Sequence, residues 1–525
     1  MNNFKQKLLS FLGGRNFASG VLVAIVIASV VFVNVIAYTV TASFGLYIYT
    51  PERPDFTISD TFSEVFGEAT DKGAEVTVTF CMYEDNVRTH STGSYVLETA
   101  KRFEEKYGEL ISLRYINLIT MYDQDGNDVS EELAQYKSII EKEKEEYLAG
   151  KSSTYSALSK TSVIFRSGEN YKIVTDTTSG SGYVDFFTLD AEGYVTSYNG
   201  EEIFASMINW VLKDEHPKAY FTTGHGESFN RNLYTALLCA GYEIDVINLR
   251  NPKLTDDEIK KMLEGTSLII ISNPTADFEK AAAGSDIKNS EIQRLEEYAS
   301  DGGAFLITTD PYFPEAKLNN LYEFIGSYGI GMLGGADGNV QTVRDTENGI
   351  PGDGFTIYAE YGDSTVAKDV AGKLSDSGRV ILRDVSPLKL SGKATALLKT
   401  SDSSVCFADG EIVNSDGSYS IAALSEKTSD RGYTSKMFFI PSIYLTASDA
   451  MVSTGYANKD FMYSLFEVCF GLGDMPYGAN SIVYDNQVLE GLTMGTANTL
   501  TIALVAIPSV LALVGAVTLI RRKNR

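Results

Sequence analysis

Cysteine and histidine are scarce in this chain. Its 525 residues include four cysteines and three histidines. No two cysteines form a C-x-x-C pair, so the motif for structural zinc or thioredoxin-type redox chemistry is missing. So few histidines argue against a multi-histidine metal site, and cysteines this far apart do not indicate a disulfide framework. We expect no metal and no cofactor, and we interpret Cys81 and Cys239, which lie in apolar-patterned segments, as buried thiols.

Three motifs of nucleotide, acyl-transfer and calcium chemistry are also missing. Without a G-x-x-x-x-G-K-[ST] loop, the chain does not itself hydrolyse ATP in the P-loop manner. No Gly-x-Ser-x-Gly or Gly-x-Cys-x-Gly elbow follows an expected strand, so no acyl-transfer nucleophile is indicated. The run from Asp123 to Asp128 resembles a calcium loop, but Gly126 comes two places early and Ala134 stands where the bidentate acid belongs. We interpret this run as a polar turn.

Basic residues are outnumbered by acidic ones. The 44 Lys and Arg face 69 Asp and Glu, a formal charge of −25. Residues 1–16 and 521–525 hold seven of the bases and none of the acids, which leaves −32 on the remainder. A surface this negative repels nucleic acid and anionic lipid headgroups, so neither is expected as a partner. Simple solubility is the plainer interpretation of the charge.

Two long apolar segments, 17–38 and 498–520, predict transmembrane helices, because about 20 such residues cross a bilayer. Lys5, Lys7 and Arg15 precede the first, and a cationic cluster at 521–525 follows the second. Cationic flanks stay in the cytoplasm, so both termini are expected there, with residues 39–497 outside the plasma membrane. A signal peptide cleaved near residues 40–42 is the alternative for the first segment, and a buried core helix for the second.

Alternating patterns predict an α/β fold with two modules between the spans. In the first, strands at 75–82 and 110–117, a helix at 95–107 and a hairpin at 161–175 suggest a thioredoxin-like order. A charged helix at 130–148 carries an apolar stripe that we expect to face the core. The stripe consists of Leu133, Tyr136, Ile140 and Tyr147.

The second module alternates strictly between apolar strands and helices, which predicts a doubly wound parallel sheet covered on both faces. Thr255 and Glu258 form a capping box at one helix start. Residues 331–354 are expected to be a Gly-rich loop, and 355–470 to continue the α/β core with β insertions. The predicted organisation is a tail at 1–16, a span at 17–38, an α/β module at 55–200, a parallel α/β domain at 201–330, its continuation at 331–485, a span at 498–520 and a tail at 521–525.

Polar turns follow three of the expected parallel strands, at the sheet edge where such folds bind ligands. The candidate residues for binding a ligand or a partner are Gly224, His225, Gly226, Glu227, Ser272, Asn273 and Asp310. The glycines permit a tight turn with exposed amides, while the His and Glu side chains could transfer protons. A structural turn, a ligand site and a catalytic site all remain open from these residues.

Several runs resemble the auxiliary component of gliding-motility-type ABC transporters (GldG-like). They are Ile203–Trp210, Pro217–Glu227, Gly241–Glu243, Asn248–Leu249, Leu268–Asn273, Tyr298–Pro311, Leu397–Ser401 and Tyr456–Gly471. The strand followed by Gly-His-Gly-Glu is the most specific piece. One departure is Ile440–Ile443, where the family usually shows a Gly-Asp-Ser-Asp-like turn.

The resemblance implies an extracytoplasmic subunit that works with an ABC-2-type permease and its cytoplasmic ATPase. It also implies a central domain similar to class I glutamine-amidotransferase-like folds, without their catalytic cysteine. We therefore expect a non-enzymatic, membrane-anchored accessory subunit. The alternatives are an amidotransferase-like or hydrolase-type enzyme using His225 and Glu227, and a stand-alone cell-envelope binding protein.

Overall fold

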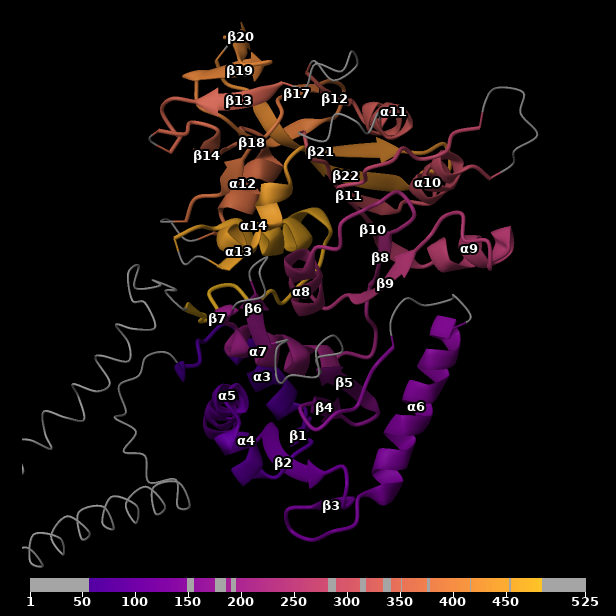
Figure 1. Cartoon of the computed structure of the whole chain (residues 1–525), viewed down its shortest axis with the longest axis vertical. Coiled ribbons are helices and arrows are strands. Elements are labelled where there is room, and N and C mark those ends of the chain that lie inside the picture. The colour runs from indigo at the N-terminus through magenta and orange to yellow at the C-terminus, as the bar shows by residue number, and fades with distance from the viewer. Residues whose placement is uncertain are drawn as a thin grey trace, which may run out of the picture. The chain divides into compact units, whose positions relative to one another are not determined.

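The chain between the predicted spans folds around two sheets, each with helices on both faces (Figure 1). The structure, a computed structural model, describes residues 56–483 apart from 149–154, 175–185, 190–194, 282–288, 312–317, 334–340, 351, 375–377, 416 and 453–454. The predicted spans and tails lie outside these residues. None of the described helices has the length and apolar run that a bilayer crossing needs.

The first sheet has the order β3-β2-β1-β4-β5. Strands β1 and β2 are parallel, whereas β4 runs antiparallel to β1 and forms a hairpin with β5, as the sequence predicts. The elements here are α3 (Ser63–Asp71), β1 (Val76–Phe80), α4 (Glu84–Thr89), α5 (Gly93–Lys106), β2 (Ile111–Asn117), β3 (Tyr122–Asp123), α6 (Ser130–Leu148), β4 (Val163–Ser167), β5 (Asn170–Val174) and α7 (Gly200–Val211).

Alternate strand residues divide between the two faces of this sheet. Val76, Val78 and Phe80 pack on the side of α5 and α7, and Ile116 and Ile164 pack on the side of α6. Only half of the predicted stripe on α6 is core, because Leu133 and Tyr136 are buried but Ile140 is half-buried and Tyr147 is exposed. The last turns of this 19-residue helix contact the chain that follows it instead, where the Tyr147 ring lies 5.3 Å from the Tyr155 ring.

The second sheet has ten strands, of which β9-β8-β10-β11-β22 are parallel and the rest antiparallel. Its parallel part and helices are β8 (Lys218–Thr222), α8 (Arg231–Cys239), β9 (Glu243–Ile247), α9 (Asp256–Leu263), β10 (Thr266–Ser272), α10 (Glu291–Ser300), β11 (Ala304–Thr308), α11 (Asn319–Gly326), β22 (Thr434–Ile440) and α14 (Asn458–Ser464). Helices α9, α10 and α11 cover one face, and α8 and α14 cover the other (Figure 1). The predicted capping box at Thr255 is confirmed.

Short strands extend this sheet and form small sheets beside it. They are β12 (Ile330–Met332), β13 (Thr342–Asp345), β14 (Thr356–Tyr358), β15 (Glu360–Tyr361), β16 (Ile381–Arg383), β17 (Leu388–Leu390), β18 (Thr395–Lys399), β19 (Ser404–Ala408), β20 (Glu411–Asn414) and β21 (Ser420–Thr428), with the helices α12 (Thr365–Ala371), η4 (Ile443–Thr446), α13 (Ser448–Val452) and η5 (Leu465–Cys469). The expectation of a loop over 331–354 is wrong, because β13 lies within it and pairs with β19. Val343 is fully buried, so this Gly-rich stretch still contributes to the core.

The first and last described segments of the chain are tied together. The Asn480 side chain donates to Thr57 O (2.6 Å), and the Glu201 carboxylate accepts from Ser59 N (2.7 Å) and Asn480 N (2.9 Å). Strand β23 (Ile482–Val483) then pairs with β7 (Val195–Tyr198), whose other neighbour is β6 (Phe187–Leu189). Asp55–Tyr484 thus forms one compact unit, which contains the first module, the second module and the continuation of the second.

Candidate functional site

The predicted polar turns flank the place where the strand order of the parallel sheet reverses. Strand β8 lies between β9 and β10, so the chain moves to one side after β8 and to the other after β9. Ligands of open α/β sheets bind outside the carboxyl ends of strands at such a switch point. Residues 224–227 follow β8, and residues 272–275 begin at the last residue of β10, so both turns lie at the carboxyl ends of parallel strands.

Both glycines of the first turn have left-handed backbone angles. Gly224 has φ 114° and Gly226 has φ 69°, a region that L side chains rarely adopt. A Cβ on Gly226 would stand 2.1 Å from Thr275 Oγ1, which itself contacts His225 O at 3.2 Å. The turn therefore needs glycine for its angle and for the close approach of the loop after β10.

Replacing Gly226 with alanine is expected to lower the free energy of unfolding by about 2–4 kcal/mol, from left-handed strain plus overpacking. Gly241→Ala is the matched control, because Gly241 has φ 92° but nothing within 4 Å of an added Cβ. It should cost only the strain, about 1–2 kcal/mol. Urea unfolding of both full-length variants, followed by the fluorescence of Trp210, measures the difference. Equal losses would show that contact with Thr275 is unimportant.

His225 bridges two carboxylates. Its Nδ1 lies 3.2 Å from Glu227 Oε1, and its Nε2 lies 2.9 Å from Glu291 Oε2 at the start of α10. The ring stacks on Phe278 with centroids 3.9 Å apart, and the residue is 7% exposed. Its carbonyl accepts from Thr275 N (2.8 Å). One side chain thus joins the turn after β8, the loop after β10 and helix α10.

The two carboxylates fix the charge of the ring. Burial lowers the pKa of His225, but hydrogen bonds to Glu227 and Glu291 outweigh burial and raise the pKa to about 9. Burial raises the pKa of Glu227, and its bonds to His225 reverse this and leave it lowered. At neutral pH the group is an imidazolium between two carboxylates. Both ring nitrogens act as donors, so His225 has no lone pair left with which to accept a substrate proton.

The remaining predicted residues lie on the neighbouring turns. Ser272 O accepts from Ser228 N (3.2 Å), and Asn273 N donates to Thr308 O (2.9 Å), which links the loop after β10 to β11. Asn273 has φ 49°, and its buried Oδ1 has no hydrogen-bond partner among the described residues. Asp310 is half-buried. Burial raises the pKa of Tyr322, and the charges of Asp277 and Asp310 add to this in a smaller measure. The structure thus joins the first two turns.

The four cysteines are all free and buried, which confirms the interpretation of Cys81 and Cys239. Burial raises the pKa of Cys81 to about 12 and the pKa of Cys239 further. Thiols this protonated are poor nucleophiles. Among the described residues, no group of three or more His, Cys, Asp or Glu side chains is placed to hold a metal ion.

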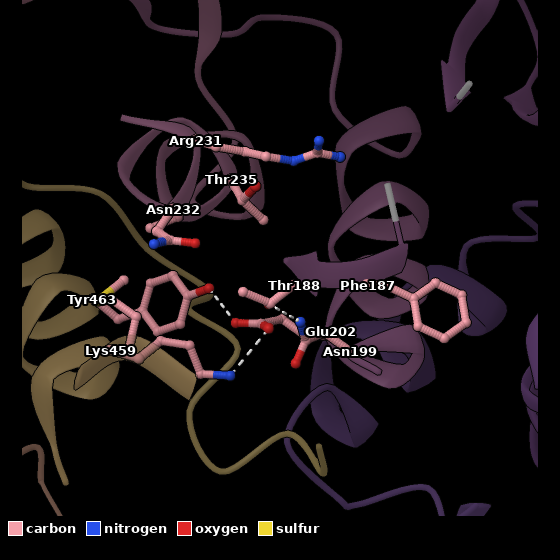
Figure 2. Close-up of a pocket in the computed structure, with 11 residues that line it drawn as sticks. Phe187, Thr188, Asn199, Glu202, Arg231, Asn232, Thr235, Lys459 and Tyr463 are labelled. Atoms are coloured by element: carbon pink, nitrogen blue, oxygen red, sulfur yellow. Dashed lines mark hydrogen bonds and ion pairs between the residues drawn. The ribbon is translucent and has the colours of Figure 1, made fainter. Parts of the chain in front are cut away.

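A second polar site, which the sequence did not predict, lies between α7, α8 and α14. Figure 2 shows side chains from these helices and from β6 converging on a small pocket. Arg231, Asn232 and Thr235 come from α8, Lys459 and Tyr463 from α14, Glu202 from α7, Thr188 from β6 and Asn199 from the turn before α7. The pocket thus joins the N-terminal module to the C-terminal helices.

Glu202 is the centre of this pocket and is 2% exposed. It accepts hydrogen bonds from the Tyr463 hydroxyl and from Lys459 Nζ, the latter at 3.0 Å. Burial lowers the pKa of Lys459, but the Glu202 charge reverses this and leaves it raised. Burial and the same carboxylate raise the pKa of Tyr463 well above its usual range. A buried carboxylate that is fully paired in this way holds two parts of the fold together.

A signal for Glu202 is present in the sequence. Two adjacent acids, Glu201 and Glu202, open a helix that is otherwise apolar, and acids are almost never fully buried unless paired. Their partners could not be identified from the sequence, because Lys459 lies 257 residues away.

Comparisons with known proteins find only distant likenesses. No family model matches the chain, and no curated protein matches it. Among solved structures, the mmIFT52 N-terminal domain is 18% identical, with a TM-score of 0.36, and the match covers 49% of this chain and 99% of that one. The cytoplasmic protein STM3548 from Salmonella typhimurium is 13% identical, with a TM-score of 0.30, over 48% of this chain and 98% of its own. None of these likenesses assigns the chain to a family.

Proposed function

We propose that this chain is a non-enzymatic, membrane-anchored accessory subunit of an ABC-type transport system. Its two apolar end segments would span the plasma membrane with both termini cytoplasmic, and residues 39–497 would lie outside. This outer part would bind an ABC-2-type permease, which works with a cytoplasmic ATPase, or a cell-envelope ligand. The resemblance to the gliding-motility-type auxiliary component supports these partners.

The observation that carries the non-enzymatic part is the saturation of His225. In open α/β enzymes the switch-point edge presents groups that are free to react, whereas here both imidazole nitrogens are engaged with Glu227 and Glu291. The alternative of a hydrolase using His225 and Glu227 would first have to break this buried cluster. The unpaired Asn273 Oδ1 favours the second candidate, a binding role for the same edge.

The strand orders support the finer fold assignments within this proposal. The parallel strands β9-β8-β10-β11-β22 have the 2-1-3-4-5 order of flavodoxin-like sheets, which agrees with an amidotransferase-like central domain. The order β2-β1-β4-β5, with a parallel pair followed by an antiparallel hairpin, agrees with a thioredoxin-like first module.

Purification of the tagged full-length chain in mild detergent should recover an ABC-2-type permease and its ATPase. The matched control keeps residues 1–54 and 485–525 and carries an unrelated soluble domain between them. We expect this control to lose the permease, because the proposal assigns binding to the outer part. Repeated recovery of the chain alone would overturn the proposal, and equal recovery by the control would overturn the role of the outer part.

A further inference from the structure

The loop after β2 displays the most exposed large apolar side chain of the described residues. Ile119 is 90% exposed, and Tyr122 and Met121 beside it are 47% and 36% exposed. Single exposed apolar residues are ordinary, but a group of three within four positions is the kind of patch that marks interaction sites.

Hydrogen bonds from its backbone N–H groups to Asn117 hold this loop in one conformation. Asn117 Oδ1 accepts from Ile119 N (2.9 Å) and Thr120 N (3.1 Å), and Asn117 O accepts from Met121 N (2.8 Å). Met121 has φ 60°, a left-handed angle that an unbranched non-glycine residue adopts only when its surroundings impose it. The apolar side chains are therefore already held in place, and binding a partner would lose little conformational entropy in this loop.

A hollow of about 480 Å³ lies beside the loop. The residues that line it include two tyrosines, Tyr83 and Tyr122, together with Thr120 and Asp85. Tyr83 follows β1 and Thr120 follows β2, so the hollow lies at the carboxyl ends of the two parallel strands. Its volume is in the range of ligand pockets.

The rim of the hollow is acidic. Two acids, Asp85 and Asp123, line it. Asp85 is exposed, and no cation lies within ion-pair distance of it among the described residues. The nearby cations are already used: Arg88 and Lys101 pair with Glu84, and Arg114 pairs with Glu132 and faces Asp123 at 3.6 Å. The local field therefore favours a positively charged occupant.

We propose that this hollow and Ile119 form a docking surface for a protein partner that presents a Lys or Arg side chain beside an apolar residue. The cation would lie against the faces of Tyr83 and Tyr122, close to Asp85, where ring and carboxylate both attract it. Its apolar neighbour would pack on Ile119 and Met121. The identity of the partner rests on the proposed function: it is an extracytoplasmic segment of the permease.

The test places a photo-crosslinking amino acid at Thr120 in the full-length chain, co-expressed with the permease and ATPase. Irradiation should yield a crosslink to the permease, identified by mass spectrometry. The same amino acid at Ile412, which is 59% exposed on β20, is the control and should give none. Ile119→Asp should lower recovery of the permease about tenfold, as expected for an interface anchor. Asp85→Asn should weaken recovery mainly at low salt, since screening already weakens it at high salt.

The outcomes separate the two proposals. If the wild-type chain recovers no permease, the proposed function fails and this inference falls with it. If the wild type recovers the permease, but crosslinks arise only at residue 412 or Ile119→Asp recovers it equally well, this inference alone is wrong. Ile119→Asp should leave the Trp210 unfolding curve unchanged, because an exposed side chain contributes little to stability.

Discussion

Replacing His225 with alanine is expected to lower the free energy of unfolding by about 3–5 kcal/mol, the cost of leaving buried charges without their partner. Glu227 and Glu291 would then face each other with no cation between them, and their side chains are 5% and 3% exposed. The effect should be largest near pH 6–7, where the wild-type ring is fully protonated.

The same cluster predicts how stability depends on pH. The pKa of His225 is about 9 in the fold and about 6.5 in the unfolded chain, so the folded state binds the proton more tightly. Its contribution, about 3 kcal/mol by linkage, is complete below pH 6.5 and is lost as the pH rises through 9. The stability difference between wild type and His225→Ala should therefore shrink between pH 6.5 and 10.

Urea unfolding of the full-length variants in detergent measures both effects, because Trp210 is the only tryptophan of the chain. The double variant His225→Ala/Glu291→Gln is the control, since it removes one of the two facing carboxylates and should recover part of the loss. A His225→Ala loss below about 1 kcal/mol, with no change in its pH dependence, would contradict an ionic role for this residue.

Replacing Glu202 with alanine should lower the free energy of unfolding by about 3 kcal/mol, because Lys459, whose side chain is 22% exposed, loses its counterion. Tyr463 would also lose the acceptor of its hydroxyl. We expect both the α7 side and the α14 side of the pocket in Figure 2 to loosen. Amide hydrogen exchange should therefore become faster in both α7 and α14.

A matched pair of variants separates charge from packing at this site. Glu202→Leu/Lys459→Met replaces both charges with apolar groups of similar length and should be within about 2 kcal/mol of wild type, since a buried ion pair can often be exchanged for packing. The free energy of unfolding of Glu202→Gln should fall between that of the double apolar variant and that of Glu202→Ala. If the double apolar variant is as unstable as Glu202→Ala, the packing of the pocket rather than its charge pairing holds α7 to α14.

Hydrophobic periodicity predicted the elements of the fold well where the periodic segment was long. The alternating strands and helices from β8 to β11, the hairpin β4–β5 and the Thr255 capping box were all visible, because each depends on residues close together in sequence. Strands such as β13 and β17, of four and three residues, were not, since so short a segment carries no period. Their conformation is decided by the strands beside them, which lie far along the chain.

The candidate site shows the same division. Glycines before and after a histidine, following an apolar strand, predicted a tight turn, and the structure has one after β8. What that histidine does depends on Glu291, 66 residues away, and this partner cannot be identified from a local motif. The pairing of Glu202 with Lys459 is hidden for the same reason.

The bond between Asn480 and Thr57, and the bonds that Ser59 and Asn480 both donate to Glu201, have a mechanical consequence. The chain enters and leaves this unit at one place. A force that pulls both ends in the same direction therefore puts no tension across the core. A pull that separates the ends first unzips β23 from β7 and strips Glu201 of its bonds, a few hydrogen bonds in all. The contact between the two ends would therefore break under tension before the strands of either large sheet separate.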